Sequence, residues 1–430
     1  MAIIPQLPLF AWDQIEALGD LDRLRLTLDY LPDGPLVERL EVLRGHGRDD
    51  YPVRAIWNSV LAGVVFQHSS IESLRRELKR NGQLRYVCGL SGVPSAAAYT
   101  RFLHGVIRYD EEIDAMFERM VEELATLLPG FGRRTALDGK ALPSFAKHKA
   151  SSDAPDGRRD TEGDYGKKTY KGKHKDGTAW EKVVRWFGYH LHLVVDTEYE
   201  LPLAFAVTKA SAVDLPGGKA LLQQMDERQH WLLERMASLT ADKGYDDTDL
   251  TVMLFEQYGI KPVIDIRHSW RDGETSRLLP GHTNATYDLH GNVDCYEPET
   301  GTRHRMANGG FEKDRMTLKK LCPARHSGIT CQALDSCPLA KGLRVPLAID
   351  RRIFTPIDRS SYAWQRLYKE RTAVERANSR LDVSFGFELH TIRGLAKMKL
   401  RVGLALCVML AMAIGHIREQ EKDKIRSLVA

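Results

Sequence analysis

The 430-residue sequence has few cysteines, little net charge and no apolar run long enough to cross a membrane. Six cysteines in a chain of this length exclude a small secreted scaffold held together by disulfides. The longest uninterrupted apolar run, 402–415, falls short of the roughly 18 residues that a membrane span requires. The N-terminus lacks the features of a signal peptide, and a net charge of +4 does not by itself indicate a polyanionic partner. We expect a soluble, intracellular protein of roughly two to three domains.

The first 130 residues are expected to be helical. Apolar side chains recur at helical spacing over 111–128, and Pro129-Gly130 ends that helix. The segment 69–72 has the pattern of a capping box, and Pro94-Ser95 opens another short helix, 96–104. Two short helices with a glycine-bearing connection are compatible with a helix-turn-helix that places Arg101 against DNA, although many small helical bundles share this pattern. We interpret residues 1–130 as a DNA-binding or dimerisation region.

From Arg133 onward the pattern changes to strands alternating with helices. The expected elements are, in order, a strand at 135–138, a hairpin at 186–195 and 201–207, a helix at 218–236, a strand at 237–242, a helix at 247–258 and a strand at 261–266. This order predicts a layered α/β or α+β domain with a mixed sheet. The polar stretch 267–342 interrupts the pattern and is expected to have its own structure. Helices return at 362–381 and 395–420.

Three carboxylates stand where a sheet enzyme would hold metal ions. Asp138 and Asp242 each end a predicted strand, and Glu375 lies in a late helix. Tyr368 and Arg371 precede Glu375 at helical spacing, so these three side chains are expected to share one helix face. In-line attack on a phosphodiester uses two Mg²⁺ ions about 3.5–4 Å apart, and magnesium takes hard oxygen ligands. Considered one at a time, the three acids also fit ordinary structural roles. Asp138 could be a turn residue, Asp242 a charge at the start of a helix, and Glu375 a solvated helix residue.

Four segments carry a resemblance to a known family: 135–140 (TALDGK), 188–196 (GYHLHLVVD) with 201–205 (LPLAF), 241–246 (ADKGYD) and 368–381 (YKERTAVERANSRL). They resemble the bacterial insertion-sequence transposases with a DDE catalytic triad and a Y-x2-R-x3-E signature. The resemblance covers about residues 130–415. It implies a ribonuclease H-like mixed sheet flanked by helices over 131–430, with a cysteine-containing insertion at about 267–342 before the last catalytic helix.

By this resemblance, Asp138, Asp242 and Glu375 bind two Mg²⁺ ions, for which Mn²⁺ can substitute, and Tyr368 and Arg371 contact DNA near the cleaved phosphate. The implied activity is cleavage at transposon ends and joining of the 3′-hydroxyl to target DNA. The expected partners are double-stranded DNA, as terminal inverted repeats and as target, and a second copy of the chain on that DNA, with no membrane. One position departs from the signature, because Asp382 stands where the family has a lysine. A domesticated DNA-binding protein that no longer cuts and a stand-alone metal-dependent nuclease are the alternatives.

Three further patterns have less specific meanings. The segment 167–185 is strongly basic, with interleaved aromatic residues, and suits either a DNA backbone contact or a solvated loop. Its candidate DNA-binding residues are Lys167, Lys168, Lys171 and Lys173. Cys295, Cys322, Cys331 and Cys337 contain no C-x2-C pair, so their spacing favours reduced cysteines over a zinc site. His190 and His192 alternate on a predicted half-exposed strand and are assigned no role.

Overall fold

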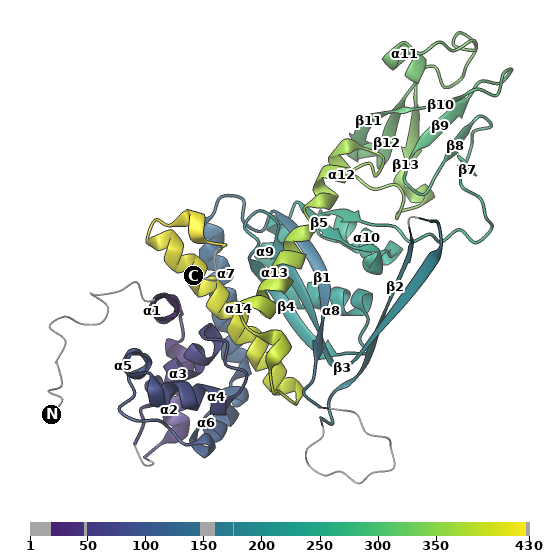
Figure 1. Cartoon of the computed structure of the whole chain (residues 1–430). Coiled ribbons are helices and arrows are strands. Elements are labelled where there is room, and N and C mark those ends of the chain that lie inside the picture. The colour runs from purple at the N-terminus through teal and green to yellow at the C-terminus, as the bar shows by residue number, and fades with distance from the viewer. Residues whose placement is uncertain (1–18, 47–49, 147–159, 175, 427–430) are drawn as a thin grey trace, which may run out of the picture.

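A computed structural model describes residues 19–46, 50–146, 160–174 and 176–426 (Figure 1). Seven helices precede the first strand. They are α1 (Asp20–Tyr30), α2 (Gly34–Arg44), α3 (Val53–Val65), α4 (Ile71–Arg80), α5 (Gly82–Cys88), α6 (Ala96–Arg108) and α7 (Asp110–Leu127). Ser70 and Ser95 cap α4 and α6, because their side chains accept hydrogen bonds from the backbone N–H groups of Ser73 and Ala98. The helices expected from the periodicity and capping patterns are therefore present.

A mixed sheet of six strands follows. Its strands are β1 (Arg134–Pro143), β2 (Asp164–Lys173), β3 (Ala179–Asp196), β4 (Pro202–Lys209), β5 (Ser238–Ala241) and β6 (Lys261–Ile264). β3 pairs antiparallel with β1, β2 and β4, whereas β5 and β6 continue the sheet from β1 in parallel. The path β4-β3-β1-β5-β6, three antiparallel strands and then two parallel ones, is the ribonuclease H-like arrangement. The predicted fold class is confirmed.

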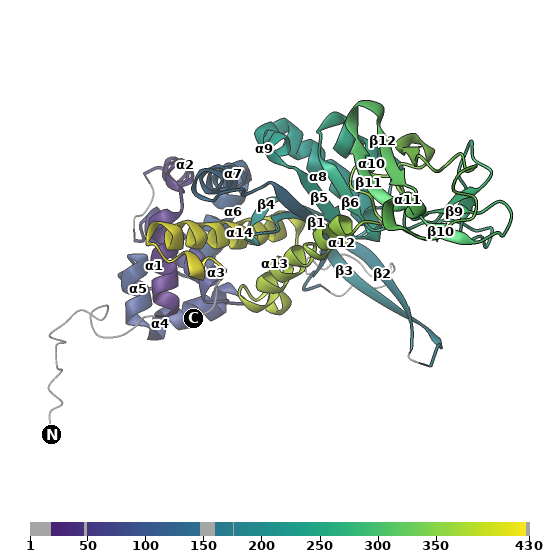
Figure 2. The ribbon, with the colours of Figure 1, turned by 90° about the horizontal axis from the view of Figure 1, so that it is seen from above.

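Helices cover the two faces of this sheet. α8 (Asp214–Arg228) lies so close to one face that a Cβ at Gly217 would stand 2.0 Å from the ring of His192 on β3. α13 (Thr372–Val383) crosses the other face and buries Ala373, Val374, Ala377 and Leu381. Figure 2 shows α8 and α13 on opposite sides of the sheet. Side chains that alternate along β1 therefore point to different helices.

The long helix α14 (Leu395–Arg418) packs against α7, α1, α3 and β4, between the N-terminal helices and the sheet (Figure 1). It is longer than the apolar run in the sequence, and its length and composition alone would allow it to cross a membrane. However, 89% of its most apolar 18-residue window is buried inside the protein. α14 is thus the core helix that unites the N-terminal helices and the sheet in one hydrophobic cluster.

The chain between β6 and α12 (Tyr362–Lys369) forms an arm with its own small core (Figure 1). It contains two antiparallel sheets. One comprises β7 (Arg277–Leu278), β8 (Ala285–Tyr287), β9 (Val293–Tyr296) and β10 (Arg303–Arg305); the other comprises β11 (Ala307–Glu312), β12 (Thr317–Leu321) and β13 (Leu343–Pro346). The fully buried Lys320 ammonium donates to Asp358 (2.6 Å) and to the side chain of Asn308 (2.7 Å). This buried ion pair joins β12 to the last segment of the arm, which leads into α12.

Several elements differ from the sequence-based expectations. The first strand, expected to end at Asp138, continues to Pro143, and the helix expected at 247–258 is divided into α10 (Thr248–Val252) and a π-helix, Met253–Gln257. The basic segment 167–185 is not a loop: β2 and the first half of β3 form a long hairpin, in which Thr169 pairs with Val183. The helix expected at 218–236 is divided at Gln229 into α8 and α9 (His230–Arg235). The helix expected at 362–381 is divided into α12 and α13, because the chain tightens into three-residue turns at Glu370 and Arg371.

Candidate active site

Asp138 and Asp242 occupy neighbouring positions on two parallel strands. β1 pairs with β5 so that Leu137 lies opposite Ala241, and the two acids are the next residues along each strand. Asp138 is 15% exposed and accepts a hydrogen bond from the Gly139 N–H at 2.8 Å. Asp242 follows β5 and accepts from the Gly244 N–H at 2.6 Å. Burial, reinforced by the charge of Asp242, raises the pKa of Asp138 to about 6, against the opposing effect of Lys168.

Glu375 reaches this pair of acids through Arg371. The Arg371 guanidinium donates to Glu375 at 2.6 Å and lies 3.9 Å from Asp138. The ring of Tyr368 lies under the same guanidinium, 5.9 Å from its centroid. The break between α12 and α13 therefore does not separate Tyr368, Arg371 and Glu375, and the structure brings all five predicted site residues to one place.

The donor set of this place fits a hard divalent cation. All three acids supply carboxylate oxygens, which magnesium prefers, and two of them are neighbouring like charges that need a cation to coexist. Burial, followed by the charges of Asp214, Asp138 and Asp242, raises the pKa of Tyr245, whose hydroxyl has no hydrogen-bond partner among the described residues. In the described part of the chain the three acids do not all lie within 4.8 Å of one another, and Glu375, 51% exposed, turns to Arg371. Arg371 thus provides the positive charge between Asp138 and Glu375.

A second cluster lies against the opposite face of β1, and sequence reasoning missed it. Asp214, at the start of α8, stands 3.2 Å from the His190 ring nitrogen. A Cβ at Gly139 would come within 2.4 Å of the Asp214 carboxylate, and one at Gly244 within 3.2 Å. The glycines that follow Asp138 and Lys243 were the available sequence signal, because each marks a close approach. His190 and His192 are buried, 3% and 0% exposed, so the expectation of a half-exposed strand is wrong.

The predicted DNA-contacting cations do not form one group. Lys168 is at the site, where its ammonium donates to the Gly139 carbonyl at 3.2 Å and lies 3.8 Å from Asp214. Lys167 is exposed on β2, and the side chains of Lys171 and Lys173 lie outside the described residues. Arg101 is exposed on α6, which belongs to the helical region and not to the sheet (Figure 1). Lys168 is thus the candidate that the structure brings to the acids.

The structure gives a partner to Asp382, the residue that departs from the family signature. Asp382 ion-pairs with Lys140, with 2.5 Å between Oδ2 and Nζ. Lys140 follows Asp138 by two residues and therefore shares its face of β1. Arg376 and Arg380 instead bind the buried Glu200, with Arg376 at 2.7 Å. These two arginines hold α13 to the turn between β3 and β4.

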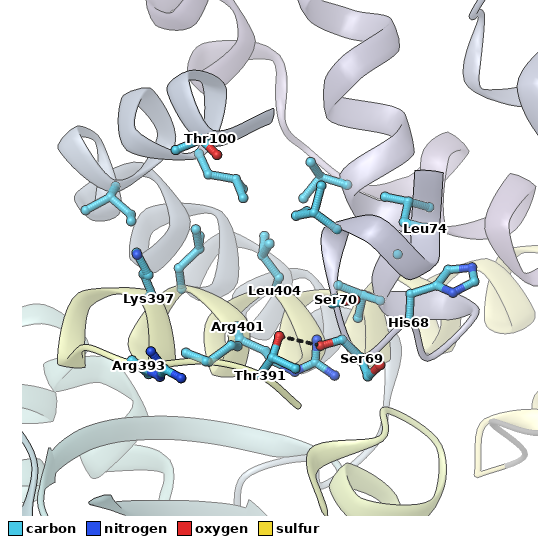
Figure 3. A pocket seen from close by; sticks show the side chains of 18 of the residues that line it. His68, Ser69, Ser70, Leu74, Thr100, Thr391, Arg393, Lys397, Arg401 and Leu404 are labelled. Atoms are coloured by element: carbon cyan, nitrogen blue, oxygen red, sulfur yellow. Dashed lines mark hydrogen bonds between the residues drawn. The ribbon is translucent and has the colours of Figure 1, made fainter. Parts of the chain in front are cut away.

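A cavity lies away from the acids. It has a volume of about 440 Å³ and is lined by α3, α4, α6 and the start of α14 (Figure 3). Its lining is mainly apolar, with Arg393, Lys397 and Arg401 among the lining residues. The Thr391 hydroxyl donates to the Ser69 carbonyl at 3.1 Å and ties the segment before α14 to the N-terminal helices. None of the three site acids lines this cavity.

The chain is similar to proteins of one known family. No curated protein sequence matches the chain. Among solved structures, the chain is similar to a piggyBac transposase in a cryo-EM synaptic complex with hairpin DNA, at 9% identity and a TM-score of 0.38, over 97% of this chain and 80% of that one. Residues 130–411 match the family model of the transposase DDE domain, and this range contains Asp138, Asp242 and Glu375. The chain therefore belongs to the DDE transposase family.

Proposed function

We propose that this chain is an active transposase, which binds transposon ends, cleaves DNA by metal-dependent phosphodiester hydrolysis and joins the freed 3′-hydroxyl to target DNA. The observation that carries the proposal is the position of Arg371 between Asp138 and Glu375, with Asp242 on the adjacent strand. Acids from three separate elements thereby come together, two of them around one positive charge. That convergence is what a phosphoryl-transfer site requires.

Members of the family generally use divalent metal ions, and we propose two Mg²⁺ ions here, with Mn²⁺ able to substitute. Asp138, Asp242 and Glu375 would hold these ions. When bound, the ions supply charge neutralisation and activation of the attacking oxygen. Arg371 then exchanges Glu375 for a phosphate oxygen, and Tyr368, beneath it, limits where that phosphate lies.

The proposed partners are the element's terminal inverted repeats and the target DNA. We propose that Lys167 and Lys168 of the hairpin of β2 and β3 contact DNA phosphates, as does Arg101 of α6. Lys171 and Lys173, whose side chains lie outside the described residues, stay predicted DNA contacts. Because two transposon ends must be held together, we propose that two copies of the chain assemble on DNA. The protein would act in the cytoplasm, at the nucleoid.

A strand-joining assay tests this function against its two alternatives. The substrate is a labelled duplex that carries the gene's own flanking ends, mixed with a plasmid target and Mg²⁺. We expect cleavage at the end boundary and labelled plasmid products. Cleavage without joined products would identify a metal-dependent nuclease instead, and binding without cleavage would identify a domesticated DNA-binding protein. Asp249→Asn, which changes an 88% exposed carboxylate, is the matched control and should retain both activities.

A further inference from the structure

Four cysteines of the arm surround one small cavity, although they are scattered along the sequence. Cys295 lies on β9, Cys322 follows β12, and Cys331 and Cys337 lie in the segment between α11 (Pro323–Ser327) and β13. All four line a cavity of about 20 Å³, together with Glu297 and His304. The four thiols are free. A cavity of this size holds a single water-sized species.

The contacts around the cavity are those of metal-binding groups. His304 bonds Glu297 at 2.8 Å, and the Glu297 carboxylate, a His304 ring nitrogen and the Cys331 sulfur all lie within 4.8 Å of one another. Cys295 pairs with His304 across β9 and β10, so their side chains share one face of the sheet. Thiolate, imidazole and carboxylate groups are the ligands that zinc takes in proteins.

The chain around the cavity has little regular structure or core packing of its own to stabilise it. Within 322–338 only Cys337 packs against the hydrophobic core of the arm, and the next buried core residue is Leu339. This segment contains a single five-residue helix, α11, and otherwise consists of turns in the described structure. Small units with so little buried apolar surface commonly depend on a metal or a disulfide for stability.

We propose that the arm binds one structural Zn²⁺ ion in this cavity, through the thiolates of Cys295, Cys322, Cys331 and Cys337, with the His304–Glu297 pair beside it. Four sulfur donors select zinc over magnesium, because thiolates are soft ligands, and a closed four-coordinate set leaves no open position for catalysis. The ion would link β9 of one small sheet to the chain that follows β12 of the other. The usual C-x2-C spacing is missing because the ligands come from both sheets. This site is independent of the proposed DNA chemistry.

Metal analysis of the full-length chain, purified without chelators or metal-affinity resin, tests the proposal. We expect about one zinc per chain in the wild type, as for a closed structural site, and loss of most of it in Cys322→Ser and Cys337→Ser. Cys88→Ala and Cys407→Ala remove thiols outside the arm and should keep the zinc. Replacement of the zinc by Co²⁺ should produce thiolate-to-cobalt absorption bands whose intensity corresponds to four sulfur ligands.

Three results would overturn the proposal. The first is that the wild-type chain neither contains zinc nor develops the cobalt–thiolate bands. The second is that zinc persists in every cysteine variant of the arm. The third is that zinc is lost in His304→Gln but kept in Cys322→Ser. The first measurement needs no variant, so a misfolded mutant does not leave the question open. Because none of these measurements involves DNA cleavage, the zinc site can fail while the transposase function stands, and the reverse also holds.

Discussion

Lys140 and Asp382 form an ion pair, with 2.5 Å between Nζ and Oδ2, that joins the strand of Asp138 to the helix of Glu375. Asp382 follows Glu375 by two helical turns and therefore lies on the same side of α13. The resemblance noted from the sequence predicts a lysine at this position of the helix; in this chain the position holds Asp382, and the positive charge in contact with it comes from Lys140 on β1. The pair fixes α13 against β1 beside the three acids.

The Lys140–Asp382 pair should contribute to stability as a unit. Both side chains are largely buried, 14% and 24% exposed, so we expect a coupling energy of about 1–2 kcal/mol, above that of an exposed pair. Urea unfolding of Lys140→Met, Asp382→Asn and the double variant measures this coupling in a double-mutant cycle. In cleavage assays, the exchange Lys140→Asp with Asp382→Lys should recover activity that Lys140→Asp alone loses. Additive effects in both assays would show that the two residues act separately.

Gly139 should tolerate no side chain. Its Cβ would stand 2.4 Å from the Asp214 carboxylate and 2.5 Å from the His190 ring, both held in packed positions. We expect Gly139→Ala to lower the free energy of unfolding by about 1–3 kcal/mol and to abolish cleavage, because the adjacent Asp138 moves with the backbone. Gly82→Ala is the control, since the nearest atom would lie 3.7 Å away at the start of α5. Equal stability of the two variants would contradict the packing of Asp214 under Gly139.

Substitutions of Lys168 and of its neighbour Lys167 should have similar effects on DNA binding but different effects on the rate of DNA cleavage. Each contributes one positive charge to the hairpin, so Lys167→Gln and Lys168→Gln should each reduce the salt dependence of DNA binding by a similar, small amount. Lys168 also contacts the Gly139 carbonyl and lies near Asp214, whereas Lys167 is exposed. Lys168→Gln should therefore slow cleavage of saturating DNA about tenfold, a loss of roughly 1.4 kcal/mol in the barrier. Equal cleavage rates for the two variants would remove Lys168 from the site.

The buried histidine His192 should make the fold sensitive to mild acid. Burial, followed by the neighbouring His190, lowers the pKa of His192 to about 4, whereas it is near 6.5 in the unfolded chain. The unfolded state therefore binds a proton first as the pH falls, and stability is lost between pH 6.5 and pH 4. We expect the shifted pKa of His192 to lower the free energy of unfolding by roughly 2 kcal/mol between pH 7 and pH 5. Urea unfolding of His192→Gln at both pH values should show a correspondingly smaller loss, and an unchanged loss would contradict the assignment.

Much of the site could be predicted from the sequence because two of its acids end recognisable apolar runs, although Asp138 lies within β1 and only Asp242 follows its strand. Asp138 and Asp242 end apolar runs, and adjacent parallel strands bring such positions together. Helical spacing related Tyr368 and Arg371 to Glu375, and this relationship survived the break between α12 and α13. The fold followed from the order of strands and helices.

The contacts that escaped prediction depend on register and on long-range packing. Asp214 meets His190 and Gly139 only because α8 is seated against one particular place on β1 and β3, which no local pattern encodes. The basic hairpin was mistaken for a possible loop because charged side chains mask its alternation, although Thr169 and Val183 are paired strand residues. The gathering of the arm's cysteines requires two sheets, so their linear spacing carried little information.

Whether the three acids form a metal-dependent catalytic site is tested most directly by measuring both DNA cleavage and DNA binding. The proteins to compare are the wild type, Asp138→Asn, Asp242→Asn and Glu375→Gln. The substrate is the labelled duplex with the gene's flanking ends, in Mg²⁺ and in EDTA. We predict Mg²⁺-dependent cuts at the end boundary in the wild type. EDTA and each substitution should abolish these cuts, while each variant retains its affinity for the transposon ends. Wild-type cleavage rates in any one of the three variants would contradict the assignment of that residue, and cleavage in EDTA would contradict the metal-dependent mechanism as a whole.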